Sequence, residues 1–179
     1  MKKLILLIAI GLSLSCEKEK VQNQTEDIQL SKATAEISSN GASQISGLGT
    51  YAVTGECEPL LEGAAYAIKM TGELEGCLYA FIDNFECSPS GTYRESGREY
   101  FVGTYKGVAG TFWTGYEFAG RYEGCPENGE ALGAEIFGRC QHPIVPGSGE
   151  GVFEGVTGRL DFKDDIEAQN FPYRGHLRF

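Results

Sequence analysis

Apolar and polar side chains alternate with a period of two through most of the chain after residue 47, which is the pattern of half-buried β-strands. The clearest run is 111–123. It places Phe112, Tyr116 and Phe118 on one face and the charged residues Glu117 and Arg121 on the other. We expect the aromatic face to pack inward and the charged face to meet water.

Eight segments show this alternation: 48–57, 64–71, 73–87, 92–105, 111–123, 132–142, 152–162 and 171–179. Clusters of Gly, Pro, Asn and Ser separate several of them, as turns require. No window after residue 46 has the period of an amphipathic helix. The pattern predicts an all-β fold, an eight-stranded antiparallel barrel that leaves no exposed sheet edge, with a two-sheet β-sandwich as the alternative.

The N-terminal sequence has the pattern of an export signal. Lys2 and Lys3 precede an apolar run that is too short to span a bilayer, which predicts a signal peptide over residues 1–15. Residues 12–16, Leu-Ser-Leu-Ser-Cys, resemble the lipobox of bacterial lipoproteins, although Ser13 stands where that family usually carries leucine. The resemblance implies cleavage before Cys16 and fatty acylation of Cys16. The alternative is an ordinary signal peptide with a chance cysteine.

Residues 16–46 are expected to be the lipidated cysteine and a flexible linker, because no aromatic residue and no sustained period occurs after Cys16 in this stretch. Residues 47–179 are expected to form the barrel domain. Two acyl chains on Cys16 give stable membrane attachment. We therefore expect an exported protein that is lipid-anchored to a bacterial membrane, the outer membrane being the favoured one.

Charge and cysteine content limit the classes of partner and metal that the protein could bind. The formal net charge is −10, which argues against nucleic acid as a partner. Five cysteines remain after Cys16, an odd number that predicts one or two disulfides and a leftover thiol in an exported protein. They are Cys57, Cys77, Cys87, Cys125 and Cys140. Their spacing neither assigns pairs nor gives a zinc site, and we expect no metal and no cofactor.

The stretch from Gly147 to Leu160, GSGEGVFEGVTGRL, resembles the glycine-rich strand near the end of plant allene oxide cyclases, and Phe171-Pro172 is similar to their later Phe-Pro step. The resemblance implies an allene-oxide-cyclase-like barrel of eight antiparallel strands, an architecture that dirigent proteins share. It also implies a homo-oligomer, with the trimer as the family's form. The matching positions are glycines and strand residues, so no catalytic residue is carried over.

Two candidate reactive groups stand near the end of the sixth segment. Cys140 and His142 share a strand face, which makes a nucleophile–base pair conceivable, but residues two apart need not touch, and a disulfide at Cys140 would abolish the pair. His176 lies between Arg174 and Arg178 on the charged face of the last segment, where a solvated or ion-paired role is expected.

The charged strand faces allow two interpretations, inward or outward, that differ by one residue of strand register. Turned inward they would line a polar interior; turned outward they are surface. The aromatic residues on the opposite faces favour the outward reading for Glu117, Arg121, Glu123, Glu135, Arg139, Arg174 and Arg178, and we expect Arg94, Arg98 and Glu99 to be exposed too. An acidic turn holds Asp161, Asp164, Asp165 and Glu167; a calcium site there is the alternative to a solvated loop.

The leading expectation is a lipoprotein without catalytic activity whose barrel binds an apolar small molecule or a protein partner. The candidate ligand-binding residues are Phe112, Tyr116, Phe118 and Tyr173. A cyclase- or isomerase-type enzyme that acts inside the barrel is one alternative, and a structural or adhesion module is the other. A cavity of roughly 300–1,000 Å³ would favour binding or catalysis, and a filled interior would favour the module.

Overall fold

A computed structural model describes residues 41–125 and 132–179 of the chain. Within them the secondary structure is β throughout, in nine strands: β1 (Ser43–Tyr51), β2 (Tyr66–Gly72), β3 (Leu74–Cys87), β4 (Thr92–Tyr105), β5 (Val108–Gly124), β6 (Leu132–Pro143), β7 (Glu150–Gly151), β8 (Thr157–Lys163) and β9 (Phe171–Arg178). The predicted signal peptide, Cys16 and most of the predicted linker lie outside the described residues.

Eight of these strands close into an antiparallel barrel. The sheet runs β4-β3-β2-β1-β9-β8-β6-β5, and pairing of β4 with β5 joins its two edges. The short strand β7 lies outside the ring and pairs with β5. The predicted eight-stranded barrel is therefore confirmed, and the alternative sandwich is wrong.

Two strand predictions need correction. The first strand occupies Ser43–Tyr51 rather than 48–57, because residues 52–65 form a loop that a disulfide at Cys57 ties back to β3. The seventh predicted segment, 152–162, is a strand only from Thr157. Before it, a turn with Gly151 at φ 64° lets Phe153 fold into the end of the barrel, where it is fully buried.

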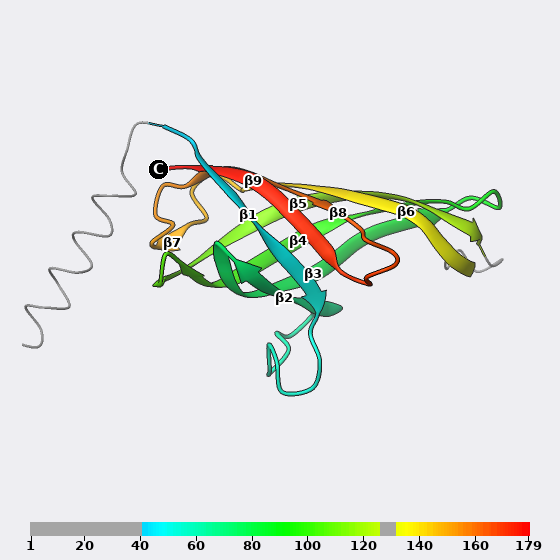
Figure 1. The fold of residues 1–179 in the computed structure, drawn as a ribbon, viewed down its shortest axis with the longest axis horizontal. Helices are drawn as coiled ribbons and strands as arrows, with labels where there is room; N and C mark the ends of the chain where they lie inside the picture. The colour runs from blue at the N-terminus through cyan, green and yellow to red at the C-terminus, as the bar shows by residue number, and fades with distance from the viewer. Residues whose placement is uncertain (1–40, 126–131) are drawn as a thin grey trace, which may run out of the picture.

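The barrel has two unequal ends (Figure 1). Strands β3, β4, β5 and β6 contain 14, 14, 17 and 12 residues, whereas β1, β2, β8 and β9 contain 9, 7, 7 and 8. The four long strands project beyond the others at the end opposite the C-terminus. We call this the open end. At the closed end, near β7, Phe153 packs against Phe112 with ring centroids 4.8 Å apart.

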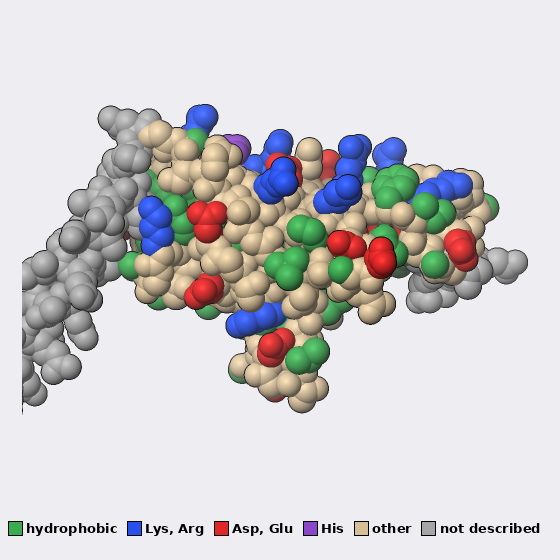
Figure 2. Space-filling model, in the orientation of Figure 1, with side chains coloured by type: hydrophobic (Ala, Val, Ile, Leu, Met, Phe, Trp, Pro, Cys, Tyr) green, Lys and Arg blue, Asp and Glu red, His purple; other side chains and the backbone are tan. Residues whose placement is uncertain are grey.

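The aromatic strand faces point inward, as the alternation predicted. Phe112, Tyr116 and Tyr173 are all at most 3% exposed, and Phe118 packs against the same core. The outer surface carries basic and acidic side chains along its length (Figure 2). No helix in the described part of the chain is long and apolar enough to cross a membrane.

Two disulfides and one free thiol account for the five cysteines of the barrel. Cys57 pairs with Cys77 on β3, and Cys87 at the end of β3 pairs with Cys125 just after β5. Cys140 is free and buried. This agrees with the expected combination of disulfides and a leftover thiol, and it supplies the pairing that the spacing left open.

Candidate functional site: a cavity at the open end

A cavity of about 370 Å³ lies inside the barrel toward its open end. All eight strands of the ring, or the turns directly after them, contribute to its lining. The lining residues are Tyr51, Tyr66, Ile68, Leu78, Ile82, Phe85, Tyr93, Glu95, Glu99, Tyr116, Phe118, Tyr122, Glu135, Cys140, His142, Phe162, Asp164 and Phe171. The walls are therefore mainly aromatic and aliphatic, with a few convergent ionisable groups.

The four residues named as ligand-binding candidates divide between two places. Tyr116 and Phe118 line the cavity. Phe112 lies deeper, in the packed closed end, where its ring stacks on Phe101 at 4.9 Å. Tyr173 is structural as well, since its hydroxyl accepts a hydrogen bond of 3.0 Å from the backbone N–H of Leu74.

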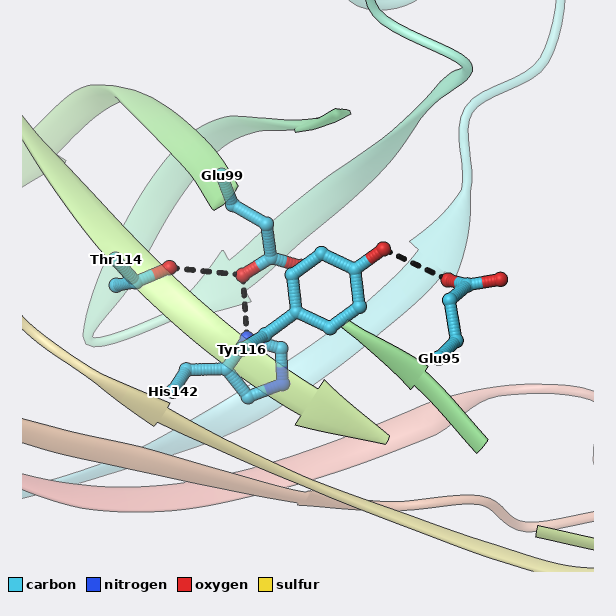
Figure 3. A network of polar contacts seen from close by, with 5 residues as sticks. All are labelled: Glu95, Glu99, Thr114, Tyr116 and His142. Atoms are coloured by element: carbon cyan, nitrogen blue, oxygen red, sulfur yellow. Dashed lines mark hydrogen bonds and ion pairs between the residues drawn. The ribbon is translucent and has the colours of Figure 1, made fainter. Parts of the chain in front are cut away.

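The floor of the cavity is a buried polar network of Glu99, Thr114 and His142 from three adjacent strands (Figure 3). Thr114 donates to Glu99 Oε2 at 2.9 Å, and the same oxygen pairs with His142 Nδ1. Each of the three residues is at most 4% exposed. Where Nδ1–H donates to Glu99, the lone pair of the neutral ring lies on Nε2, which is buried without a hydrogen-bond partner.

A second acidic centre stands nearer the mouth, where Glu95 holds two tyrosines. Tyr93 and Tyr116 each donate a hydrogen bond of 2.7 Å to its carboxylate. Burial, and after it the hydrogen bond to Glu95, raises the pKa of both phenols. The Tyr116 ring also stacks on His142, with centroids 5.9 Å apart, so it links the mouth to the floor.

The third acidic centre is a pair of carboxyl groups, Glu135 on β6 and Asp164 just after β8. The two carboxyl groups lie over Gly138, where a Cβ atom would collide with both of them. Burial, and after it the neighbouring Asp164, raises the pKa of Glu135 to about 7. Burial also raises the pKa of Asp164. Two carboxyls this close share a proton more readily than they both ionise.

Two aromatic clusters flank the mouth. In the first, Tyr51 meets Phe171 and Tyr66 edge to face at 4.9 and 5.6 Å. The second cluster surrounds Tyr93 and contains Phe85, Phe118 and Tyr122, at centroid distances of 6.3, 6.0 and 5.6 Å. Ring faces and edges thus surround the entrance from strands on both sides of the acidic pair.

The expected exposure of Glu99 is wrong. Along β4, Glu95 and Glu99 have the same parity as the buried residues Phe101 and Tyr105, so the strand alternation places both glutamates inside. That parity can be read from the sequence, whereas the charge of Glu99 alone favours the surface; Glu95 was not predicted as a site residue. Arg94 and Arg98 have the opposite parity and are exposed, as expected.

The expected exposure of Glu135 is also wrong, for a different reason. Gly120 pairs with Gly138 and Tyr122 pairs with Glu135, so two steps on β5 match three on β6. This bulge puts residues 136–137 outside and turns Glu135 into the cavity. The remaining charges expected outside do lie on the outer strand faces: Glu117, Arg121, Glu123, Arg139, Arg174 and Arg178.

The other candidates take separate places. Cys140 lines the cavity beside His142, but burial raises the pKa of its thiol, which keeps the thiol protonated. His176 lies on the outer face of β9. The acidic turn does not converge: Asp161 pairs with Arg159 at 2.9 Å, and Asp164 enters the cavity. Asp165 accepts a hydrogen bond from a backbone N–H within its own turn, and Glu167 is exposed.

Within residues 41–125 and 132–179, no group of three or more His, Cys, Asp or Glu side chains is arranged to hold a metal ion. The chain matches no protein-family model, no curated protein and no solved structure. The resemblance of residues 147–160 to allene oxide cyclases stays a prediction.

Proposed function

We propose that this chain is a lipoprotein of the bacterial cell envelope whose barrel binds a small organic molecule in the cavity at its open end. The cavity carries the proposal. Its volume of about 370 Å³ falls within the range of small-molecule sites, and its apolar walls with few convergent polar groups have their usual composition. Attachment to a membrane through Cys16 rests on the signal pattern of residues 1–16.

Paired glycines make room for side chains that line the cavity. Gly120 on β5 lies opposite Gly138 on β6, and both are buried. A Cβ at Gly120 would lie 2.8 Å from the Phe118 ring, and one at Gly138 would collide with the acidic pair. A structural or adhesion module would need no cavity of about 370 Å³, because a small barrel is ordinarily filled by its own side chains.

Native mass spectrometry of the full chain isolated from envelope extract tests this proposal. We expect a small molecule to co-purify with the wild type. Ile82 lines the mouth, so Ile82→Trp should remove the added mass; Ile136, exposed on the outer face of β6, gives the matched control Ile136→Trp, which should retain it. A wild type without added mass, or equal loss in both variants, overturns the proposal.

Anchoring has its own test. Cys16→Ser removes the only proposed acyl acceptor, so the variant should leave the membrane pellet for the soluble fraction of the extract. Cys140→Ser is the matched control, since Cys140 is buried inside the barrel. If Cys16→Ser stays with the membrane after a high-salt wash, the lipid anchor is wrong.

The Glu99–His142 pair favours a proton-transfer enzyme, such as an isomerase, as the second candidate function. A cavity-lining histidine whose Nδ1 is held by a carboxylate and whose Nε2 has no partner has the arrangement of a general base. The fate of the recovered ligand separates the two functions. Conversion by the wild type but not by His142→Gln identifies an enzyme; recovery unchanged after incubation identifies a binding protein.

A further inference from the structure

The charge of the cavity is one-sided. Four of its lining residues carry carboxyl groups, Glu95, Glu99, Glu135 and Asp164, and none of the lining residues that the structure describes is lysine or arginine. Glu99 is hydrogen-bonded to the imidazole of His142, and the Arg–Asp ion pairs among residues 41–125 and 132–179 join outer-surface residues. Three carboxyl groups therefore face the cavity without a cation.

Two buried acceptor atoms of the cavity lining lack a hydrogen-bond partner. His142 Nε2 is buried, lines the cavity and has no hydrogen-bond partner, and in the neutral ring it holds a lone pair. Glu135 Oε1 is likewise buried without a partner. A buried acceptor that lacks a donor destabilises the empty cavity, because it has lost its hydrogen bonds to water. A ligand that donates several hydrogen bonds would remove this cost at both residues.

The aromatic walls favour the same ligand. The negative face of a phenyl or phenol ring attracts a cation, and more strongly where water is excluded. The Tyr51 and Tyr93 clusters stand at the mouth beside Glu95 and the acidic pair. An organic cation would be held by ring faces along its body and by carboxylates at its charged group.

We infer that the cavity is selective for organic cations: small molecules that join an apolar or aromatic body to a protonated amine. This inference rests on the proposed function and names its ligand class. The ammonium N–H groups donate to carboxylates of the cavity and to Nε2 of His142, and the body lies between the two aromatic clusters. On the face of the barrel shown in Figure 2, by contrast, basic and acidic side chains are mixed.

Binding of a cation should be linked to proton release. The acidic pair shares a proton when empty, and a bound ammonium group would favour the form with both carboxylates ionised. Affinity should then rise with pH up to about 7 and level off above it. The ionisable groups around the pair are Tyr122 on β5, Tyr51 on β1, Glu95 on β4 and His142 on β6.

Three probes of similar size distinguish ligand charge: 2-phenylethylamine, 2-phenylethanol and 3-phenylpropanoate, titrated calorimetrically into the full chain carrying Cys16→Ser. We expect the amine to bind at least about tenfold more tightly than the alcohol, and the carboxylate more weakly than either. Glu95→Gln and Asp164→Asn should each lower amine affinity several-fold and leave alcohol affinity unchanged. Glu117→Gln removes the same charge from the outer surface and is the matched control.

The outcomes distinguish the inference of cation selectivity from the proposed function of small-molecule binding. If alcohol and amine bind equally, or if Glu117→Gln weakens the amine as much as Glu95→Gln does, the cation inference is wrong and the cavity remains a small-molecule site. If none of the three probes binds and no ligand co-purifies with the chain, the proposed function itself fails. Thermal unfolding of each variant verifies folding, and Glu135→Gln is the replacement where Asp164→Asn does not fold.

Discussion

At the closed end of the barrel, Phe101, Phe112 and Phe153 pack ring against ring and are fully buried. At the open end the same strands, β4 and β5, carry Glu95, Glu99, Thr114 and Tyr116 on the same inward face. Along the inward face of β4, the interior changes from apolar at Phe101 to acidic at Glu99, only two residues away. One half of the interior is thus an apolar core, and the other half is a polar site with aromatic walls.

The difference shows how a small barrel can hold buried carboxyl groups. Removing a charge from water is expensive unless the charge is paired or hydrogen-bonded. The closed end contributes tight apolar packing and contains no carboxylate or histidine among its buried residues. This packing offsets the cost of the open end, whose acceptors are left for a ligand.

The largest effect is expected at the closed end. Phe153→Ala removes a fully buried ring that contacts Phe101, Tyr105 and Phe112, and should lower the free energy of unfolding by about 3–5 kcal/mol. Phe85→Ala makes the same change at the open end, where the ring is 51% exposed, and should cost less than about 1.5 kcal/mol. Chemical denaturation measures both. Equal losses would contradict the division into two halves.

We expect the stability of the open end to depend more on a disulfide than the stability of the closed end does. The Cys87–Cys125 disulfide closes a 38-residue separation and joins the projecting strands, so Cys87→Ser/Cys125→Ser should cost roughly 3 kcal/mol. Hydrogen exchange should quicken in the outer parts of β3 to β6 and stay unchanged around Phe153. Cys57→Ser/Cys77→Ser, which frees a loop elsewhere, is the control. Equal quickening at both ends would argue that the barrel opens as one unit.

The floor of the cavity should behave as a coupled network. Glu99→Leu leaves Thr114 and His142 without their buried partner and should cost about 2 kcal/mol. His142→Leu alone leaves Glu99 unpaired, and the double variant should cost less than the sum by at least about 1 kcal/mol. A double-mutant cycle by chemical denaturation measures the coupling. Strict additivity would mean that the two side chains do not stabilise each other.

Strand alternation predicted the fold well, because burial of one face imposes a period of two on the sequence. The aromatic face of residues 111–123 lies inside as expected, and so does Tyr173. The Gly147–Val156 segment was harder to interpret. Its glycines form a turn with Phe153 at its tip, and Phe153 and Val156 are apolar whether they belong to a strand or to a plug.

The site was predicted less well than the fold. Tyr116 and Phe118 were named correctly as inward aromatic residues, but nothing in their local pattern separates a residue that lines a cavity from one that fills a core, as Phe112 does. The parity of Glu99 was available in the sequence. The inward turn of Glu135 was not, because it depends on a bulge fixed by pairing with a distant strand.

The smallest effect concerns pH, and it should come from the open end alone. The pKa of Glu135 rises from its ordinary 4.5 to about 7 on folding, so between these values the folded state binds more protons than the unfolded chain. The free energy of unfolding should therefore fall as pH rises from about 4.5 to 7. Glu135 is partly exposed and screened by solvent, so its contribution should be no more than about 1 kcal/mol.

Glu135→Gln cannot ionise, and it should flatten this part of the curve and make the empty protein more stable than the wild type above pH 7. Thermal unfolding of both proteins across pH 4.5–8 measures the slope, with Glu117→Gln as the surface control that should retain it. A slope that persists in Glu135→Gln would place the titration elsewhere. It would also remove the reason to expect proton release when a cation binds, since that release needs a proton held between Glu135 and Asp164.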